Sequence, residues 1–173
     1  GVCEILGIPH YVLDYAPLLE TCVIDKFVRE YRLGRTPNPC IDCNRYLKFG
    51  HLLDSARTMG FDYLATGHYA KIERKESRWI LKKAKDLVKD QTYFLYPIPV
   101  AALEHILFPL ADRTKDEVRE IARQALLPIA EKPESQDLCF VTQDSYRDFL
   151  QEQGCPVHPG PIVDRSGRVL GEH

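Results

Sequence analysis

The sequence lacks the features that mark membrane and secreted proteins. No apolar run approaches the roughly 20 residues that a transmembrane helix requires, and the N-terminal segment shows no signal-peptide pattern. Acidic and basic residues nearly balance, at a formal net charge of -2, so no strong overall field draws the chain towards nucleic acid or an anionic membrane. We therefore expect a cytoplasmic protein without a membrane partner, although a local basic patch is compatible with this charge.

Internal repeats and low-complexity tracts are also absent, and the 173 residues are 45% hydrophobic. That length and composition suit one globular domain with a sizeable core and a short additional segment. The cysteines are Cys3, Cys22, Cys40, Cys43, Cys139 and Cys155. They could form disulfides in a secreted protein, but without a secretory signal we expect reduced thiols, some of them chemically active.

Apolar spacing and glycine positions predict alternating helices and strands. Helices are expected over residues 17–33 and 46–59, each followed by a glycine, and short strands over 8–13, 63–66 and the stretch RWILKKA. The order along the chain is helix, glycine, short apolar strand and second glycine. This order is typical of an α/β protein with a parallel sheet flanked by helices.

The C-terminal third predicts two further helices and a hairpin. A capping box from Thr114 to Glu117 opens a helix that Pro128 ends. The residues expected to face inward on it are Val118, Ile121, Ala122 and Ala125. The stretch DSYRDFLQEQG gives a short helix, and a hairpin pattern follows around residues 165–167. We expect an α/β domain over residues 1–152 and the start of a small β-rich domain over 153–173.

The stretch TPNPCIDCN sets Cys40 and Cys43 three residues apart. One Cys-x-x-Cys pair supplies two of the four ligands of a structural zinc site, and no second pair of this kind follows. The pair precedes a predicted helix, where a helix dipole can depress a thiol pKa. Pro37 and Pro39 predict a rigid extended loop that positions Asn38 and Cys40 instead of a redox hairpin. A buried pair of small hydrophobic side chains is the remaining alternative.

Two more stretches carry candidate residues. Cys139 precedes Phe140 and Val141, as core thiols often do, but the polar run PESQD before it predicts a mobile loop that would give the thiol access. Gly67 follows a predicted parallel strand, at the edge where α/β sheets hold ligands, although a simple turn glycine fits as well.

The stretch VKDQTYFLY offers Lys89, Asp90 and Gln91 on one turn. They supply a cation, an acceptor and an amide ahead of several aromatic residues. The alternative is the start of a helix with a solvated face.

Four stretches in order, GRTPNPCIDCNRYLKFG, YLATGHYAK, KDQTYFLY and ESQDLCFV, resemble the tRNA-specific 2-thiouridylase (MnmA/TrmU) family. Its older name is tRNA (5-methylaminomethyl-2-thiouridylate)-methyltransferase. The resemblance implies a PP-loop ATP pyrophosphatase-like fold, of the adenine nucleotide alpha hydrolase-like class. It also implies ATP-dependent sulfur transfer to C2 of the wobble uridine of tRNAs for Lys, Glu and Gln.

The resemblance also implies roles for individual residues. Cys43 matches the catalytic nucleophile and Cys139 the cysteine that carries a persulfide. The resemblance implies that Asn38, Pro39 and Cys40 contact the target base. It implies an ATP contact for Gly67. It also implies tRNA contacts for Lys89, Asp90 and Gln91. Further expectations are ATP with magnesium and a persulfide donor, either a cysteine desulfurase or a relay protein.

The implied chemistry makes sense of the two thiols. Adenylation turns the uridine oxygen into a leaving group, and a persulfide is a strong soft nucleophile. Cys43 would release the sulfur by attacking the persulfide on Cys139, which leaves a disulfide between them. Their Cα atoms must then come within about 4.4–6.8 Å. Cys40 stands where other members carry an aspartate with an acid/base role, and a thiol is a poor substitute for that role.

Both ends of the chain look cut, because no methionine begins it and the last hairpin pattern stops without a partner. The family's Ser-Gly-Gly-x-Asp-Ser phosphate loop is missing. We expect that loop and the first strand before Gly1, and a β-barrel after His173. The isolated chain is therefore predicted to bind ATP poorly and not to thiolate tRNA.

Two other functions fit the cysteines. Cys40, Cys43 and Cys139 could hold an iron–sulfur cluster with one iron open to bind sulfide. A non-catalytic, zinc-stabilised RNA-binding module would explain Cys-x-x-Cys but not the second motif around Cys139.

Overall fold

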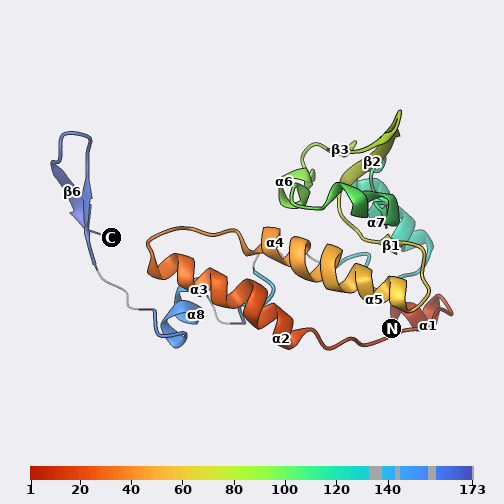
Figure 1. Ribbon diagram of the computed structural model, residues 1–173, viewed down its shortest axis with the longest axis horizontal. Coiled ribbons are helices and arrows are strands. Elements are labelled where there is room, and N and C mark those ends of the chain that lie inside the picture. The colour runs from red at the N-terminus through yellow and green to blue at the C-terminus, as the bar shows by residue number, and fades with distance from the viewer. Residues whose placement is uncertain (133–137, 143–144, 156–158, 173) are drawn as a thin grey trace.

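The computed structural model describes residues 1–132, 138–142, 145–155 and 159–172. Figure 1 shows two long helical runs lying side by side, with a small parallel strand pair and a β-hairpin beyond them. None of the helices in the described ranges has the length and apolar character needed to cross a membrane.

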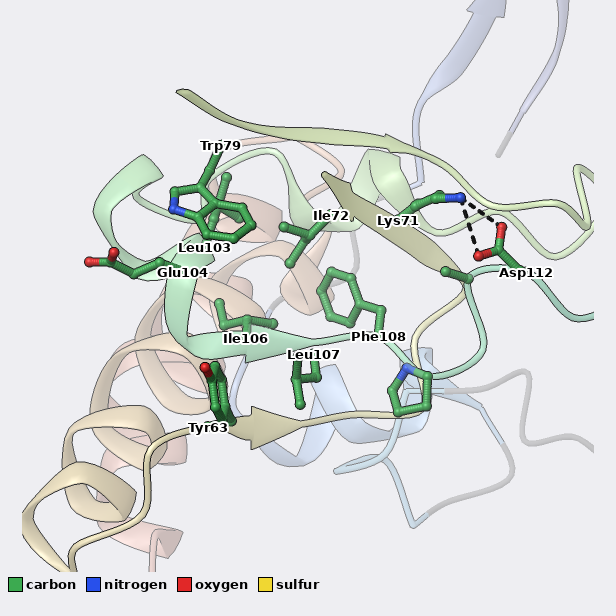
Figure 2. A pocket seen from close by; sticks show the side chains of 12 residues that line it. Tyr63, Lys71, Ile72, Trp79, Leu103, Glu104, Ile106, Leu107, Phe108 and Asp112 are labelled. Carbon is green, nitrogen blue, oxygen red and sulfur yellow. Dashed lines mark hydrogen bonds and ion pairs between the residues drawn. The ribbon is translucent and has the colours of Figure 1, made fainter. Parts of the chain in front are cut away.

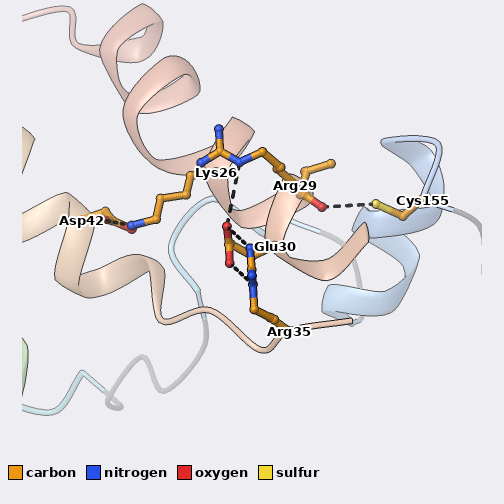
Figure 3. A network of polar contacts seen from close by, with 7 residues as sticks. Lys26, Arg29, Glu30, Arg35, Asp42 and Cys155 are labelled. Atoms are coloured by element: carbon orange, nitrogen blue, oxygen red, sulfur yellow. Dashed lines mark hydrogen bonds and ion pairs between the residues drawn. The ribbon is translucent and has the colours of Figure 1, made fainter. Parts of the chain in front are cut away.

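The first helical run confirms the helix predicted over residues 17–33. It comprises α2 (Ala16–Leu19), the π-helical η1 (Glu20–Ile24) and α3 (Asp25–Arg32). Gly34 then takes a φ of 70°, which lets the chain turn back. Arg35 Nε donates to Glu30 Oε2 at 2.6 Å, and this ion pair fixes the exit towards the next helix (Figure 3).

The second helical run begins earlier than predicted. It comprises α4 (Pro39–Asp42), η2 (Cys43–Leu52) and α5 (Leu53–Thr58), so the helix predicted from residue 46 starts at Pro39. The extended loop predicted for the Pro-Asn-Pro stretch was wrong beyond Asn38. A proline at the first helical position suits a helix, because its fixed φ is helical and its missing N–H would be unpaired there anyway.

The strand pattern is partly as predicted. β1 (Leu64–Ala65) pairs in parallel with β4 (Ile106–Leu107), and the register sets Leu64 opposite Ile106, as an α/β fold requires. The RWILKKA stretch forms β3 (Arg78–Lys83), which is antiparallel to β2 (Ala70–Lys75). The strand predicted over residues 8–13 is wrong: these residues have no regular secondary structure, are exposed and are not paired with a strand in the described part of the chain.

The remaining elements are short except for α7. They are α1 (Val2–Ile5), α6 (Thr92–Leu95), η3 (Val100–His105), α7 (Lys115–Gln124), α8 (Tyr146–Glu152), β5 (Pro161–Val163) and β6 (Val169–Glu172). The capping box is confirmed, since Thr114 Oγ1 accepts from Glu117 N at 3.3 Å and Glu117 Oε2 accepts from Thr114 N at 2.8 Å. The predicted inward face is not buried, and Ile121 is 49% exposed.

The C-terminal segment forms the two predicted elements. Ser145 caps α8, and β5 and β6 pair as an antiparallel hairpin across a turn in which Gly167 N donates to Asp164 O. The domain boundary near residue 153 stays a prediction.

Two apolar clusters hold the described residues together. One joins η2 and α5 to the hairpin and to β4, with Leu95 fully buried. The other joins η1 and α3 to α8 and to residues 138–141, with Phe27 only 2% exposed. The second cluster attaches the Cys139 segment to α3, the helix beside Cys40 and Cys43.

Candidate functional site

Cys40 and Cys43 lie in the first turns of the second helical run. Asn38 caps this helix: its Oδ1 accepts a hydrogen bond from Cys40 N at 3.2 Å, and Pro39 takes the first helical position. Residues three apart on a helix share a face, so the two thiols are neighbours. Cys40 is exposed and Cys43 is half-buried. The pair therefore sits within the start of the helix, not in a loop before it.

Buried polar side chains fix this helix in place. Asp42 is 6% exposed, and its Oδ1 accepts from Lys26 Nζ on α3 at 2.8 Å (Figure 3). Asn44 is 3% exposed, and its Nδ2 donates to Phe94 O on α6 at 3.0 Å. Directional bonds therefore hold the residues on both sides of Cys43.

Cys139 lies exposed on a tight turn. Val141 N donates to Leu138 O at 3.0 Å, so Cys139 is a central residue of that turn. Phe140 packs its ring edge-on against Phe27 of α3, with centroids 5.4 Å apart, and against Phe149 of α8 at 5.5 Å. The mobile loop predicted before Cys139, residues 133–137, lies outside the described residues.

Helix α3 brings the two cysteine segments together. Its Lys26 holds the Cys40–Cys43 helix through Asp42, and its next residue, Phe27, holds the Cys139 turn through Phe140. Cys40, Cys43 and Cys139 are all free thiols, and we refer to them as the three-cysteine site.

The charges of the three-cysteine site act on one another. Although the Cys40 residue is exposed, neighbouring atoms partly desolvate its sulfur and raise the pKa of the thiol. A negative charge on Cys139 raises this pKa further, and Lys48 opposes both effects. Burial also raises the pKa of Cys43, Lys48 lowers it, and charges on Cys139 and Cys40 raise it. Both thiols are therefore mainly protonated at neutral pH, and Lys48 is the cation that favours their thiolates.

A cavity of about 460 Å³ opens beside this site at the carboxyl end of β1. It is lined by Lys48, Leu52, Leu64, Ala65, Thr66, Gly67, His68 and Gln91. Gly67 thus follows a parallel strand, as the sequence predicted. Gln91 lines the same cavity. Lys48 belongs to both the cavity and the electrostatic surroundings of the thiols. Sequence reasoning missed Lys48, because it becomes significant only once the helix is known to run back to Pro39.

His68 is a second residue that sequence reasoning missed. Its ring packs between Phe49 and Phe108, at centroid distances of 5.7 and 5.9 Å, and Nδ1 lies 2.7 Å from Thr66 Oγ1. Burial, and to a smaller extent the charge of Lys48, lowers its pKa to about 4. The cavity therefore has a neutral imidazole in its wall at physiological pH.

Asp90 and Gln91 brace the chain ahead of α6. The Asp90 carboxylate accepts hydrogen bonds from Ala84 N at 2.9 Å and from Thr92. Gln91 exchanges two bonds with Tyr69: Gln91 Oε1 accepts from Tyr69 N at 2.9 Å, and Gln91 N donates to Tyr69 O at 2.8 Å. The helix start expected here is present. The acceptor oxygens of both side chains are thus used in shaping the protein.

A second cavity, of about 520 Å³, lies between the hairpin and the parallel strands (Figure 2). Trp79, Ile72 and Phe108 point into it, and Lys71 Nζ bonds Asp112 Oδ1 at 2.9 Å on its rim. None of the predicted site residues lines it.

No group of three or more His, Cys, Asp or Glu side chains in the described ranges is arranged to hold a metal ion, and this includes the three-cysteine site. As placed here, the three thiols are neighbours but not a ready-made ligand set for a cluster.

Known proteins resemble the whole of this chain. A family model described as the tRNA methyl transferase HUP domain matches residues 1–143. A protein named tRNA-specific 2-thiouridylase MnmA from Moorella thermoacetica is 51% identical over 175 residues, which cover 99% of this chain and 49% of that protein. Proteins of the same name from Desulforamulus reducens and Chloroflexus aurantiacus are 53% and 50% identical, each over 99% of this chain and 48% of the relative.

The chain spans about half the length of the curated relatives it matches. The match to the HUP-domain model confirms the α/β fold class, which the parallel pairing of β1 and β4 already indicated. The agreement over nearly the whole chain, at about half of all positions, leaves one conclusion. This chain belongs to the tRNA methyl transferase HUP domain family.

Proposed function

We propose that this chain is part of an enzyme that uses ATP to transfer sulfur to C2 of the wobble uridine in tRNA. The observation that carries the proposal is the three-cysteine site, in which α3 gathers thiols from two distant segments. The relatives named tRNA-specific 2-thiouridylase support it, because they match both segments. The tRNAs for Lys, Glu and Gln are the proposed substrates.

The cavity beside Gly67 is the proposed place for the nucleotide. It lies at the carboxyl end of β1, where α/β sheets bind ligands. Lys48 supplies a positive charge in its wall, which suits a magnesium-bound ATP, and His68 is neutral there. ATP contributes the adenylate that makes the uridine oxygen a leaving group.

The two thiols divide the sulfur chemistry. Cys139 carries the extra sulfur as a persulfide, and its exposed turn is open to a sulfur donor such as a cysteine desulfurase or a relay protein. The Cys43 thiolate attacks the Cys139 sulfur, forms a Cys43–Cys139 disulfide and releases sulfide. The sulfide adds to C2 and AMP leaves, so two electrons move from the thiols to the transferred sulfur.

The helix start positions the target base. Because Asn38 Oδ1 caps the helix, its NH2 group is the part that can donate to a carbonyl oxygen of the pyrimidine. Pro39 is buried and holds this geometry, and Cys40 lies beside it. Lys89 adds charge towards the tRNA backbone, and Asp90 and Gln91 shape the segment that presents it. The proposed location is the cytoplasm, where tRNA and sulfur donors meet.

The test uses the full-length protein that contains this chain. Cys43→Ser and Cys139→Ser are each expected to abolish 2-thiouridine formation, measured by mass spectrometry of tRNA nucleosides. Cys22→Ser, which changes a half-buried cysteine on η1, is the matched control and should retain activity. Thiolation at the usual rate by either of the first two variants would contradict the assigned roles.

An iron–sulfur enzyme is the second candidate, because Cys40 supplies a third thiol in the same neighbourhood. The three sulfurs would have to draw closer together to hold a cluster. In that mechanism a cluster on Cys40, Cys43 and Cys139 binds sulfide, so no persulfide is needed. Anaerobic purification should then give visible charge-transfer absorbance that is lost in Cys40→Ala. Full activity of Cys40→Ala without any such absorbance would rule this candidate out.

A further inference from the structure

Cys40 has no part in the two-thiol reaction, yet it is the exposed member of the helical pair. We propose that Cys40 is the resolving thiol of the site, which attacks the Cys43–Cys139 disulfide at Cys43 and leaves a Cys40–Cys43 disulfide and a free Cys139. This inference rests on the proposed function, since sulfur transfer is what produces the disulfide that Cys40 resolves.

The geometry of the helix start supports the product. Cys40 and Cys43 are three residues apart in one continuous helix that Asn38 caps. Side chains at this spacing have Cβ atoms about 5–6 Å apart, and a disulfide needs about 3.5–4.5 Å. Side-chain rotation turns the two sulfurs towards each other but does not move Cβ, so the first helical turn must also tighten by about 1–2 Å at the backbone for the bond to form. Cys-x-x-Cys pairs at helix starts form disulfides of this kind in thiol oxidoreductases.

The placement of Cys139 supports the starting disulfide. Its turn is anchored to α3 by Phe140 packing on Phe27, while the helical pair is anchored to α3 by Asp42 pairing with Lys26. A charge on Cys139 raises the pKa of both helical thiols, so all three sulfurs are within electrostatic reach of each other. Cys43 thus has a candidate partner on each side.

The exchange is balanced without any oxidant. The Cys40 thiolate forms a bond to the Cys43 sulfur, the bond between Cys43 and Cys139 breaks, and the electron pair leaves on the Cys139 sulfur. One disulfide is present before and after the step, and one thiolate replaces another. The Cys40 proton passes to solvent, because Cys40 is exposed.

The exchange solves a problem of access. While Cys139 is in a disulfide, it cannot accept another persulfide sulfur, so the enzyme cannot begin a second cycle. After the exchange, Cys139 is free to accept the next sulfur, and the remaining disulfide joins the exposed Cys40 to Cys43. An external dithiol, either a reductant protein or a small molecule, then reduces the Cys40–Cys43 bond to restore the starting state.

The test maps disulfides in the full-length protein that contains this chain, and it needs no tRNA. The reduced protein is treated with one equivalent of diamide, samples are trapped at intervals with N-ethylmaleimide, and tryptic peptides are weighed. Cys40 and Cys43 share the peptide 36–45, so their disulfide removes two hydrogens from it. A Cys43–Cys139 disulfide instead joins that peptide to another.

We expect the joined peptides to decay into the internally bridged peptide after the oxidant is spent, while Cys139 becomes alkylated. Cys40→Ser should trap the joined peptides. Cys3→Ser, which removes a half-buried cysteine on α1, should behave like the unchanged protein. Circular dichroism checks that each variant is folded, and the unchanged protein alone already decides which disulfide is final.

Two results would overturn the inference. They have different consequences for the proposed function. A Cys43–Cys139 disulfide that persists in the unchanged protein, with Cys40 alkylated, overturns the resolving role and leaves the proposed function intact. The absence of that disulfide even in Cys40→Ser shows that Cys43 and Cys139 do not meet, which contradicts both.

Discussion

The two segments that carry the thiols are attached to α3 in different ways. The helix with Cys40 and Cys43 is held by directional contacts, a cap from Asn38 and an ion pair from Asp42. The turn with Cys139 is held by the apolar ring of Phe140. Directional bonds fix an orientation, whereas apolar packing has no preferred direction. The difference fits the roles proposed above, with Cys43 as a fixed nucleophile and Cys139 as an adjustable sulfur carrier.

The largest effect is expected from removing the apolar attachment. Phe140→Ala deletes a half-buried ring that packs on Phe27 and Phe149, and should cost about 2–3 kcal/mol of unfolding free energy. It should also lower the yield of the Cys43–Cys139 disulfide in Cys40→Ser. Urea unfolding and peptide mapping measure the two effects. Leu126→Ala, at a residue 83% exposed, is the control, and an equal loss there would contradict the anchoring role.

Acid should lower the free energy of unfolding through His68, which lies where η2 borders the cavity. His68 packs on Phe49 of η2, and its pKa of about 4 lies below the ordinary value of 6.5. The unfolded chain therefore binds a proton between these values and the folded chain does not, so stability falls as pH drops from 6.5 towards 4. The loss should be of order 2 kcal/mol.

Urea unfolding at several pH values measures the effect of His68. In His68→Gln the part of the pH dependence due to this residue should disappear. In His10→Gln, which changes an exposed histidine, it should remain. Identical pH profiles for His68→Gln and the unchanged chain would show that His68 is not buried as a neutral imidazole.

A smaller effect is expected from breaking the directional attachment. Lys26→Met leaves the carboxylate of Asp42, 8% exposed, without its cation. Because the Lys26 side chain is 40% exposed and water screens the pair, the cost should be about 1 kcal/mol. Adding Asp42→Asn should recover part of it, as urea unfolding of the double variant can test. Lys75→Met, at an exposed lysine of β2, serves for comparison and should be neutral.

The smallest effect concerns reactivity, not stability. Lys48 lowers the pKa of Cys43, so Lys48→Met should raise that pKa and leave less thiolate at neutral pH. Alkylation of Cys43 by iodoacetamide should slow by about two- to five-fold, and Lys48→Arg should restore most of the rate. Unchanged alkylation kinetics across the pH range would show that Lys48 does not influence the pKa of the Cys43 thiol.

Local sequence rules predicted much of this fold. The Thr114 capping box, the helix ending before Gly34, the hairpin near Gly167 and the strand before Gly67 each depend on a few neighbouring residues. The strand expected at residues 8–13 failed because a strand needs a partner from elsewhere in the chain. The helix start at Pro39 was missed because prolines were read as markers of extended chain.

The site was only partly predictable for the same reason. Spacing and the family resemblance identified Cys40, Cys43 and Cys139, but not what holds them. The Asp42–Lys26 pair and the packing of Phe140 on Phe27 join residues far apart in the chain. The shared position of Lys48 likewise depends on how the helix lies against β1. Nothing in the local sequence of either segment contains that information.

The two anchors on α3, Lys26 and Phe27, are consecutive residues, and this has an evolutionary consequence. A helix turns about 100° per residue, so the two side chains leave α3 in different directions, one towards each thiol segment. Inserting or deleting one residue earlier in the helix would turn both anchors by about 100° relative to the preceding residues, so both would move away from their partners. Homologous proteins should therefore tolerate many substitutions along this helix but conserve its length, which a comparison of gaps in aligned sequences can verify.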